Sequence, residues 1–105
     1  MRDRPTPPLS VPPSQACDQL DGWTPHAERP AISKSFRFQN FAEAFGFMSE
    51  IAILAERADH HPEWFNVYNR LDVVLTTHES GGVTERDVAL AKAMDAALRT
   101  RQHPL

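Results

Sequence analysis

The sequence has little of what disulfide scaffolds, membrane helices and nucleic-acid-binding surfaces require. It contains one cysteine, Cys17, which excludes an internal disulfide and favours a reducing compartment. No stretch approaches the roughly 18 apolar residues of a membrane helix, and the initial R-D-R-P-T-P-P lacks the apolar segment of a secretory signal. Lysine and arginine do not cluster and the net charge is -3, which argues against phosphate binding. We therefore expect a cytoplasmic protein that binds neither nucleic acid nor membrane.

Proline is concentrated at the N-terminus, whereas the remaining chain has an ordinary globular composition. The 105 residues are enough for one domain with a modest core. Of the 9 prolines, those within residues 1–14 are Pro5, Pro7, Pro8, Pro12 and Pro13. Such a stretch buries too little apolar surface to offset its ordering entropy. We expect residues 1–19 to form a proline-rich, disordered tail and residues 20–105 to form the folded domain.

Alternation of apolar and polar side chains predicts a strand at residues 31–38. Ile32 and Phe36 share one face, as in a half-buried strand. Lys34 lies on that same face, which predicts that the sheet is uncovered there. Residues 23–28 are a weaker strand candidate because a proline interrupts them, and they suit an edge position.

Two segments have the period of amphipathic helices. Residues 41–58 follow an N-cap candidate, Asn40, and Pro62 ends that helix by disfavouring helical geometry before it. Residues 84–99 form the second, and a T-x-x-D sequence at its start resembles a capping box. The apolar positions expected to pack in the first helix are Phe41, Ala44, Phe45, Met48, Ile51, Ala52 and Ala55, with Phe47 and Leu54 widening the stripe.

Residues 64–68 and 71–77 are rich in aromatic and β-branched side chains and predict a hairpin, with Asn69-Arg70 as its turn. We assign the aromatic residues of the first run to core or interface rather than to ligand stacking. The resulting order is strand, strand, helix, strand, strand, helix. It predicts an α+β fold, a four-stranded antiparallel sheet with helices packed on one face.

Three histidines are the strongest candidates for chemistry. His60 and His61 end the first helix, and His78 ends the last strand beside a glycine turn, so two different elements supply imidazoles. An ordinary imidazole pKa near 6.5 permits proton donation and acceptance at neutral pH. Acidic residues close to them in sequence are Glu56, Asp59 and Glu79.

The same residues have other interpretations. Any one histidine is most simply an ordinary surface or core residue. Glu56, His60 and His78 form a candidate metal site, although no fixed spacing such as H-E-x-x-H supports it. Asp87 is explained better as a helix cap than by chemistry. Nucleophilic catalysis is disfavoured, because Cys17 is far from the histidines and no serine lies in a G-x-S-x-G elbow.

Three consecutive motifs stand out, E-x-x-x-H-H-P at Glu56–Pro62, E-W-F-N-V-Y-N at Glu63–Asn69 and T-H-E-S-G-G-V-T-E-R-D at Thr77–Asp87. Together they resemble the pterin-4a-carbinolamine dehydratase family. The resemblance covers about residues 20–98. It implies the same α+β fold, assembled into homodimers or homotetramers, and dehydration of 4a-hydroxytetrahydropterin to quinonoid dihydropterin without metal or cofactor. That step recycles the pterin cofactor of aromatic amino acid hydroxylases.

The resemblance also implies roles for individual residues. His60 and His78 would be the catalytic proton-transfer pair, and His61 would complete the site by holding the pterin ring. Glu56 and Asp87 are candidates for a supporting role. The implied substrate-binding residues are Asp59, His60, His61, Thr76, Thr77, His78 and Glu79.

A binding module on the same scaffold is the alternative function. The family includes dimerisation, assembly and transcriptional coactivator proteins, among them a partner of a homeodomain transcription factor, and some relatives lack the histidines. All three histidines are present here, which favours the enzyme. Edge strands need protection, and Trp64 and Phe65 offer apolar surface near one of them, so we expect an oligomer.

Overall fold

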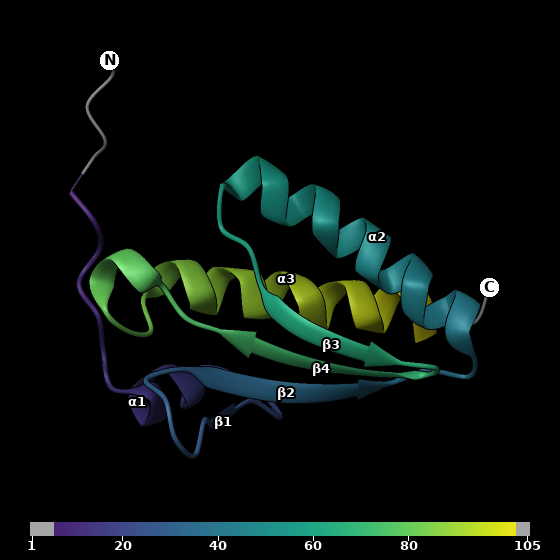
Figure 1. Ribbon diagram of the computed structural model, residues 1–105, viewed down its shortest axis with the longest axis horizontal. Helices are drawn as coiled ribbons and strands as arrows, with labels where there is room; N and C mark the ends of the chain where they lie inside the picture. The colour runs from purple at the N-terminus through teal and green to yellow at the C-terminus, as the bar shows by residue number, and fades with distance from the viewer. Residues whose placement is uncertain (1–5, 103–105) are drawn as a thin grey trace.

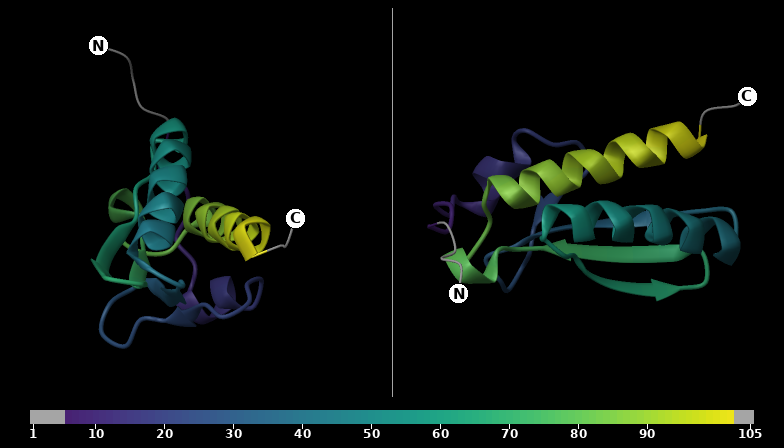
Figure 2. Two further views of the ribbon diagram at one scale, coloured as in Figure 1. Left: turned by 90° about the vertical axis from the view of Figure 1, so that its right-hand side faces the viewer. Right: turned by 90° about the horizontal axis from the view of Figure 1, so that it is seen from above.

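Four antiparallel strands form one open sheet, and helices cover one of its faces, as the sequence predicts. A computed structural model describes residues 6–102. The strands are β1 (Thr24–Pro25), β2 (Ile32–Arg37), β3 (Glu63–Val67) and β4 (Arg70–Leu75), arranged in the order β1-β2-β4-β3. The long helices are α2 (Phe41–Ala58) and α3 (Glu85–Gln102), which lie on the same side of the strands (Figures 1 and 2). Within the described chain, neither combines the length and apolar character of a bilayer-crossing helix.

The core lies between the sheet and the two long helices. Phe36 of β2 and Phe47 of α2 are buried with ring centroids 5.2 Å apart, and Phe38 lies 5.1 Å from Phe47. Aromatic pairs at such distances add to the stability that their buried area gives. The other fully buried large apolar side chains are Ile32, Ile51, Leu71, Val73, Leu75, Val83 and Met94.

Helix α2 begins and ends as predicted, and it buries only part of the predicted apolar stripe. The side chain of Asn40 caps it by accepting the Glu43 N–H at 2.8 Å. Phe41 and Phe45, which we expected to pack inward, are 49% and 55% exposed. The helix carries apolar residues around more than half of its circumference, so periodicity alone did not choose between two adjacent stripes. The stripe that packs is Ala44, Phe47, Ile51 and Ala55.

The hairpin turn lies one residue earlier than predicted, at Tyr68-Asn69. Tyr68 has φ 50°, a conformation that glycine or asparagine adopts more readily. The Asn66 side chain stabilises the turn by donating to the carbonyls of Tyr68 and Arg70 at 3.2 and 2.8 Å. Asn69 is tied to β2 because its side chain donates to the Phe38 carbonyl at 3.0 Å. Side-chain hydrogen bonds therefore replace the usual glycine.

The prediction that the sheet is uncovered at Lys34 is wrong. Helix α3 covers that position, and Asp95 accepts a hydrogen bond from the Lys34 ammonium at 2.8 Å. Asp95 also accepts the Trp23 indole N–H at 3.1 Å. The Lys34 ammonium lies 5.1 Å from the Phe36 ring centroid. A charged residue on the core face is thus paired rather than exposed, as burial requires.

A short helix, α1 (Pro13–Cys17), lies inside the segment assigned to a tail. Ala16 is fully buried, and the Val11 N–H donates to the Val83 carbonyl at 2.8 Å. Pro13 stands at the first turn, where its fixed φ favours helix and its missing N–H costs nothing. Residues 11–17 therefore pack on the domain, and residues 1–5 lie outside the described chain. The boundary between residues 19 and 20 stays a prediction.

Candidate functional site

The end of α2 separates two adjacent histidines. Asp59 closes the helix in the left-handed conformation, with φ 52°, which aspartate tolerates better than most residues. The His60 N–H donates to the Ala55 carbonyl at 3.1 Å, and Pro62 prevents further helix. As a result His60 is only 8% exposed, whereas the His61 side chain is 56% exposed.

His60 belongs to a buried hydrogen-bond network. Its Nε2 lies 2.6 Å from Asp87 Oδ1, and Asp87 is fully buried in the first turn of α3. The other carboxylate oxygen accepts the Thr84 N–H and the Thr77 hydroxyl, both at 2.8 Å. Since the carboxylate accepts, His60 Nε2 carries the hydrogen, and in the neutral ring Nδ1 is the nitrogen without a hydrogen. Asp87 is therefore both the predicted cap and the partner of a histidine.

His61 has an exposed partner on the preceding helical turn. Its Nε2 lies 2.8 Å from Glu56 Oε1, and the Glu56 side chain is 81% exposed. Such pairs between exposed groups contribute little to stability. Glu56 can orient the His61 ring without fixing the fold.

His78 comes from a different wall of the site, the short helix η1 (His78–Ser80) that follows β4. Its Nε2 lies 3.2 Å from Glu63 Oε2, at the start of β3. Arg29 donates to both oxygens of Glu63, at 2.7 and 2.8 Å. These hydrogen bonds from Arg29 lower the pKa of the Glu63 carboxyl from 4.5 to about 2, against a smaller opposing effect of burial.

A cavity of about 410 Å³ lies between these walls. The end of α2, η1 and the start of α3 meet at one end of the sheet, on the left in Figure 1. All seven residues expected to bind substrate line the cavity. The complete lining is Asp59, His60, His61, Pro62, Glu63, Thr76, Thr77, His78 and Glu79. Asp87 and Glu56 do not line it; Asp87 contacts the lining residues His60 and Thr77, and Glu56 contacts His61.

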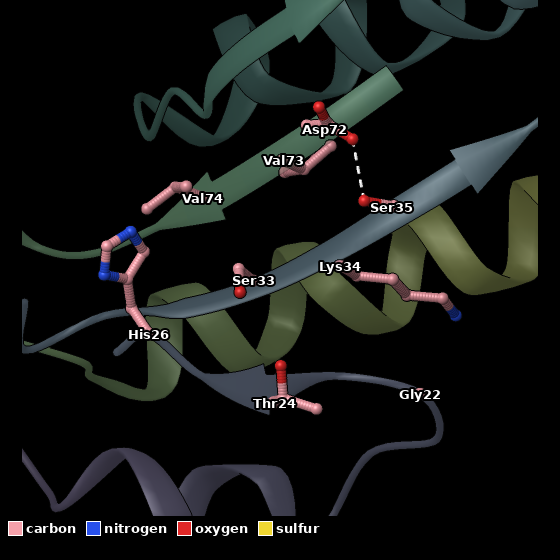
Figure 3. A pocket seen from close by; sticks show the side chains of 9 residues that line it. All are labelled: Gly22, Thr24, His26, Ser33, Lys34, Ser35, Asp72, Val73 and Val74. Carbon is pink, nitrogen blue, oxygen red and sulfur yellow. Dashed lines mark hydrogen bonds between the residues drawn. The ribbon is translucent and has the colours of Figure 1, made fainter. Parts of the chain in front are cut away.

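A second cavity, of about 300 Å³, lies against β2 and β4, and its lining residues include no histidine paired with a carboxylate (Figure 3). Ser35 donates to Asp72 at 2.7 Å across the two strands. The one imidazole there, His26, accepts the Glu28 N–H on Nδ1 at 3.1 Å. This ring is held by a backbone N–H rather than by a carboxylate, so the histidine-lined cavity is the better candidate for acid–base chemistry.

Comparison with known proteins agrees with the geometry. The sequence profile of the family described as "Pterin 4 alpha carbinolamine dehydratase" matches residues 11–97. The chain belongs to this family. A provisionally named pterin-4-alpha-carbinolamine dehydratase of Rhizobium rhizogenes is 61% identical over 82 residues, 78% of this chain and 81% of the relative. One of Bordetella avium is 58% identical over 84 residues, 80% and 78% of the two chains.

Two solved structures of the pterin dehydratase type have the same fold. The "transcriptional coactivator/pterin dehydratase" of Brucella melitensis has a TM-score of 0.77 and 52% identity, covering 80% of this chain and 89% of that one. A "pterin dehydratase-like protein" identified as a RuBisCO assembly factor in the alpha-carboxysome has a TM-score of 0.62 and 25% identity, covering 72% and 88%. The names of these two neighbours include both dehydratase and assembly or coactivator roles.

The residues of the alternative metal site do not form a cluster in the part of the chain that the structure describes. Glu56, His60 and His78 contact three different partners. Across residues 6–102, no group of three or more His, Cys, Asp or Glu side chains is placed to hold a metal ion. Cys17 lies in α1 rather than in a loose segment, and burial, followed by Asp18, raises the pKa of its thiol. A raised pKa leaves less thiolate for nucleophilic attack.

Sequence reasoning missed Glu63 and Arg29 as parts of this site. Glu63 follows the H-H-P motif and begins a strand, so its position beside the histidines was a usable signal. Arg29 is 34 positions before Glu63, in the connection between β1 and β2. Only the pairing of the strands brings the two together, so no local pattern could have found it.

Proposed function

We propose that this chain eliminates water from 4a-hydroxytetrahydropterin to give quinonoid dihydropterin. The observation that carries the proposal is the grouping of His60, His61 and His78 around one cavity of about 410 Å³, each with a carboxylate on its Nε2. The name of the family gives a pterin as the class of substrate. The proposed role is recycling of the pterin cofactor of an aromatic amino acid hydroxylase. The cytoplasmic location stays a prediction.

The reaction needs an acid and a base on one substrate. One imidazole protonates the hydroxyl at C4a, so that the C–O bond breaks and its electrons leave with water. The other takes the ring N–H proton, and the electrons of that bond form the new C=N bond. His60 and His78 are the proposed pair, because they line one cavity and come from different elements, the end of α2 and η1. A positioned proton-transfer group contributes about 10²–10⁴ in rate.

The remaining residues of the cavity are proposed to bind and orient. His61 holds the pterin ring from the exposed end of α2, with Glu56 on its Nε2. Asp87 is a positioning residue, because it is buried and acts through His60. The other proposed substrate contacts are Asp59, Thr76, Thr77 and Glu79.

Loss of 4a-hydroxytetrahydropterin with and without the purified protein tests the proposal. We expect the protein to accelerate that loss and a chelator to leave the rate unchanged. Equal rates with and without protein would contradict the proposed dehydratase activity. Loss of rate on chelation, restored by zinc, would revive the metal site of Glu56, His60 and His78.

We also propose that the chain assembles into a homodimer or homotetramer. Strand β3 is a sheet edge, and large exposed apolar side chains lie on it and on α2. Large exposed apolar side chains are typical of interaction surfaces. Here they are Phe41, Phe45 and Ile53 of α2 and Phe65 and Val67 of β3, with Tyr68 in the turn that follows; Trp64, the other residue expected there, is half-buried.

Sedimentation checks the assembly at micromolar concentration. The parent protein should sediment as a species larger than 11.8 kDa, and Phe45→Glu should shift it toward the monomer by placing a charge in an apolar contact. The control Ala96→Glu, at an exposed position of α3, should not. A parent protein found only as an 11.8 kDa species would contradict the proposal.

The same surface supports a second candidate function, a non-catalytic assembly or coactivator module. The two solved relatives named above are described with such roles. This alternative expects alanine variants of the three histidines to keep their oligomeric state and partner binding. It also expects negligible dehydration by the parent protein, which separates it from the enzyme.

A further inference from the structure

A guanidinium outside the cavity holds one of the carboxylates that line it. Arg29 binds Glu63 through both terminal nitrogens, at 2.7 and 2.8 Å, the bidentate geometry that fixes a carboxylate best. The Arg29 segment is itself restrained. Its neighbour Pro30 accepts the Thr76 hydroxyl at 2.9 Å, and the Ala31 carbonyl accepts the His26 N–H at 2.8 Å. The β1–β2 connection is therefore fixed to the wall of the site.

Glu63 uses one oxygen for two donors. Its Oε2 lies 2.8 Å from Arg29 and 3.2 Å from His78 Nε2. Because Arg29 lowers the pKa of Glu63 to about 2, Glu63 remains a carboxylate at neutral pH and can only accept. His78 Nε2 must then carry the hydrogen of that bond. Nδ1 becomes the nitrogen free to exchange a proton with a ligand.

His78 needs such a restraint more than His60 does. Its side chain is 78% exposed, so packing does not fix the ring, whereas the side chain of His60 is 9% exposed. An exposed imidazole otherwise samples several rotamers and both tautomers. Glu63 is the contact that selects one of them.

We propose that Arg29 and Glu63 are positioning residues for His78, and that this pair fixes the Nε2–H tautomer and directs Nδ1 to the substrate. The inference rests on the proposed function for its kinetic consequence, but not for the tautomer. The simpler explanation is a surface ion pair that only ties the β1–β2 connection to β3. That explanation predicts effects on stability alone.

Glu63→Ala, Arg29→Leu and the control Glu50→Ala distinguish the two. Glu50 forms a comparable surface pair with Arg101 at 3.1 Å, with 45% exposure against 41% for Glu63. The tautomer is read by ¹⁵N–¹H NMR at about pH 8.5, above the ordinary imidazole range, with the His78 signals assigned by their absence from His78→Ala. The kinetic constants are measured on the same samples, and circular dichroism confirms folding.

In the parent and in Glu50→Ala, we expect only the Nε2–H tautomer of His78. Glu63→Ala should move a measurable fraction to Nδ1–H and lower kcat roughly 10-fold, the lower end of what loss of a histidine's orienting partner costs in metal sites. Arg29→Leu should do the same to a smaller extent. This variant also keeps the test available should Glu63→Ala fail to fold.

An unchanged tautomer in Glu63→Ala and Arg29→Leu would overturn the inference, even with a reduced kcat. So would an Nδ1–H tautomer in the parent, or a changed tautomer with an unchanged kcat. A parent protein without dehydratase activity is a failure of the proposed function, and the tautomer alone then decides whether Glu63 positions His78.

Discussion

The two walls of the cavity hold a histidine by opposite means. On the α3 side, His60 is 8% exposed and Asp87 fully buried, with Thr77 and Thr84 completing the network. On the β3 side, the side chain of His78 is 78% exposed and bonded to one carboxylate. A buried network is costly to leave half-satisfied, whereas an exposed pair is worth little. One proposed proton-transfer group, His60, therefore belongs to a buried network that stabilises the fold, whereas the other, His78, is an exposed side chain that the fold does not depend on.

The largest expected effects come from removing the two histidines. His60→Ala and His78→Ala should each lower kcat by about 10²–10⁴. Only His60→Ala should also lower the free energy of unfolding, by about 1–3 kcal/mol, because it leaves Asp87 Oδ1 buried without its donor. Steady-state kinetics and urea unfolding of both variants check this. Equal losses of unfolding free energy in His60→Ala and His78→Ala would contradict the difference between the two histidines.

Removing the Asp87 carboxylate tests the support that it gives to His60. Asp87→Asn leaves one amide oxygen for the hydrogens of His60 Nε2, Thr77 and Thr84. We expect kcat to fall about 10–100-fold and the free energy of unfolding to fall by about 1–3 kcal/mol. Asp72→Asn, at a Ser35 contact on β4, is the control and should leave kcat unchanged. An Asp87→Asn variant with parental kcat would reduce Asp87 to a helix cap.

A third, smaller effect separates binding from proton transfer. His61 is exposed and held only by exposed Glu56, so His61→Ala should leave the free energy of unfolding within about 0.5 kcal/mol of the parent. If His61 holds the ring, KM should rise more than kcat falls. A reduced kcat with an unchanged KM would instead place His61 with the proton-transfer pair.

The smallest effect is a pH dependence confined to the β3 wall. The folded-state pKa of Glu63 is depressed from 4.5 to about 2, so its contribution to stability is present above pH 4.5 and is lost as pH falls through about 2. The pair is exposed, so the contribution is small and screened by salt. The difference in unfolding free energy between parent and Glu63→Gln should therefore shrink between neutral pH and pH 2. A difference that does not change with pH would contradict the Arg29–Glu63 ion pair.

Much of the fold could be predicted because its signals are local. The alternation at Ile32–Arg37 and the helical period of Phe41–Ala58 each lie in one continuous run. What failed depends on distant contacts. Lys34 was placed on an uncovered face because its partner Asp95 is 61 positions away. The packing of α1 depends on a bridge between Val11 and Val83, which no local pattern encodes.

The site divides in the same way. The adjacency of H-H-P and the later T-H-E predicted residues that now line one cavity, although their roles stay predictions. Asp87 was explained as a cap, and its T-x-x-D spacing gives no sign that the other oxygen meets His60, 27 positions earlier. Glu63 and Arg29 were missed because a carboxylate at a strand start is usually a solvated charge. Their meaning comes from the register of β3, β4 and β2.

The most direct test of the account compares 4a-hydroxytetrahydropterin dehydration by the parent protein and by the double variant His60→Ala/His78→Ala. The account predicts a parent rate well above the uncatalysed rate, and a double variant whose loss is smaller than the product of the two single losses, because water partly replaces each group. A double variant as fast as the parent would contradict it, since the histidines would then have no part in the reaction.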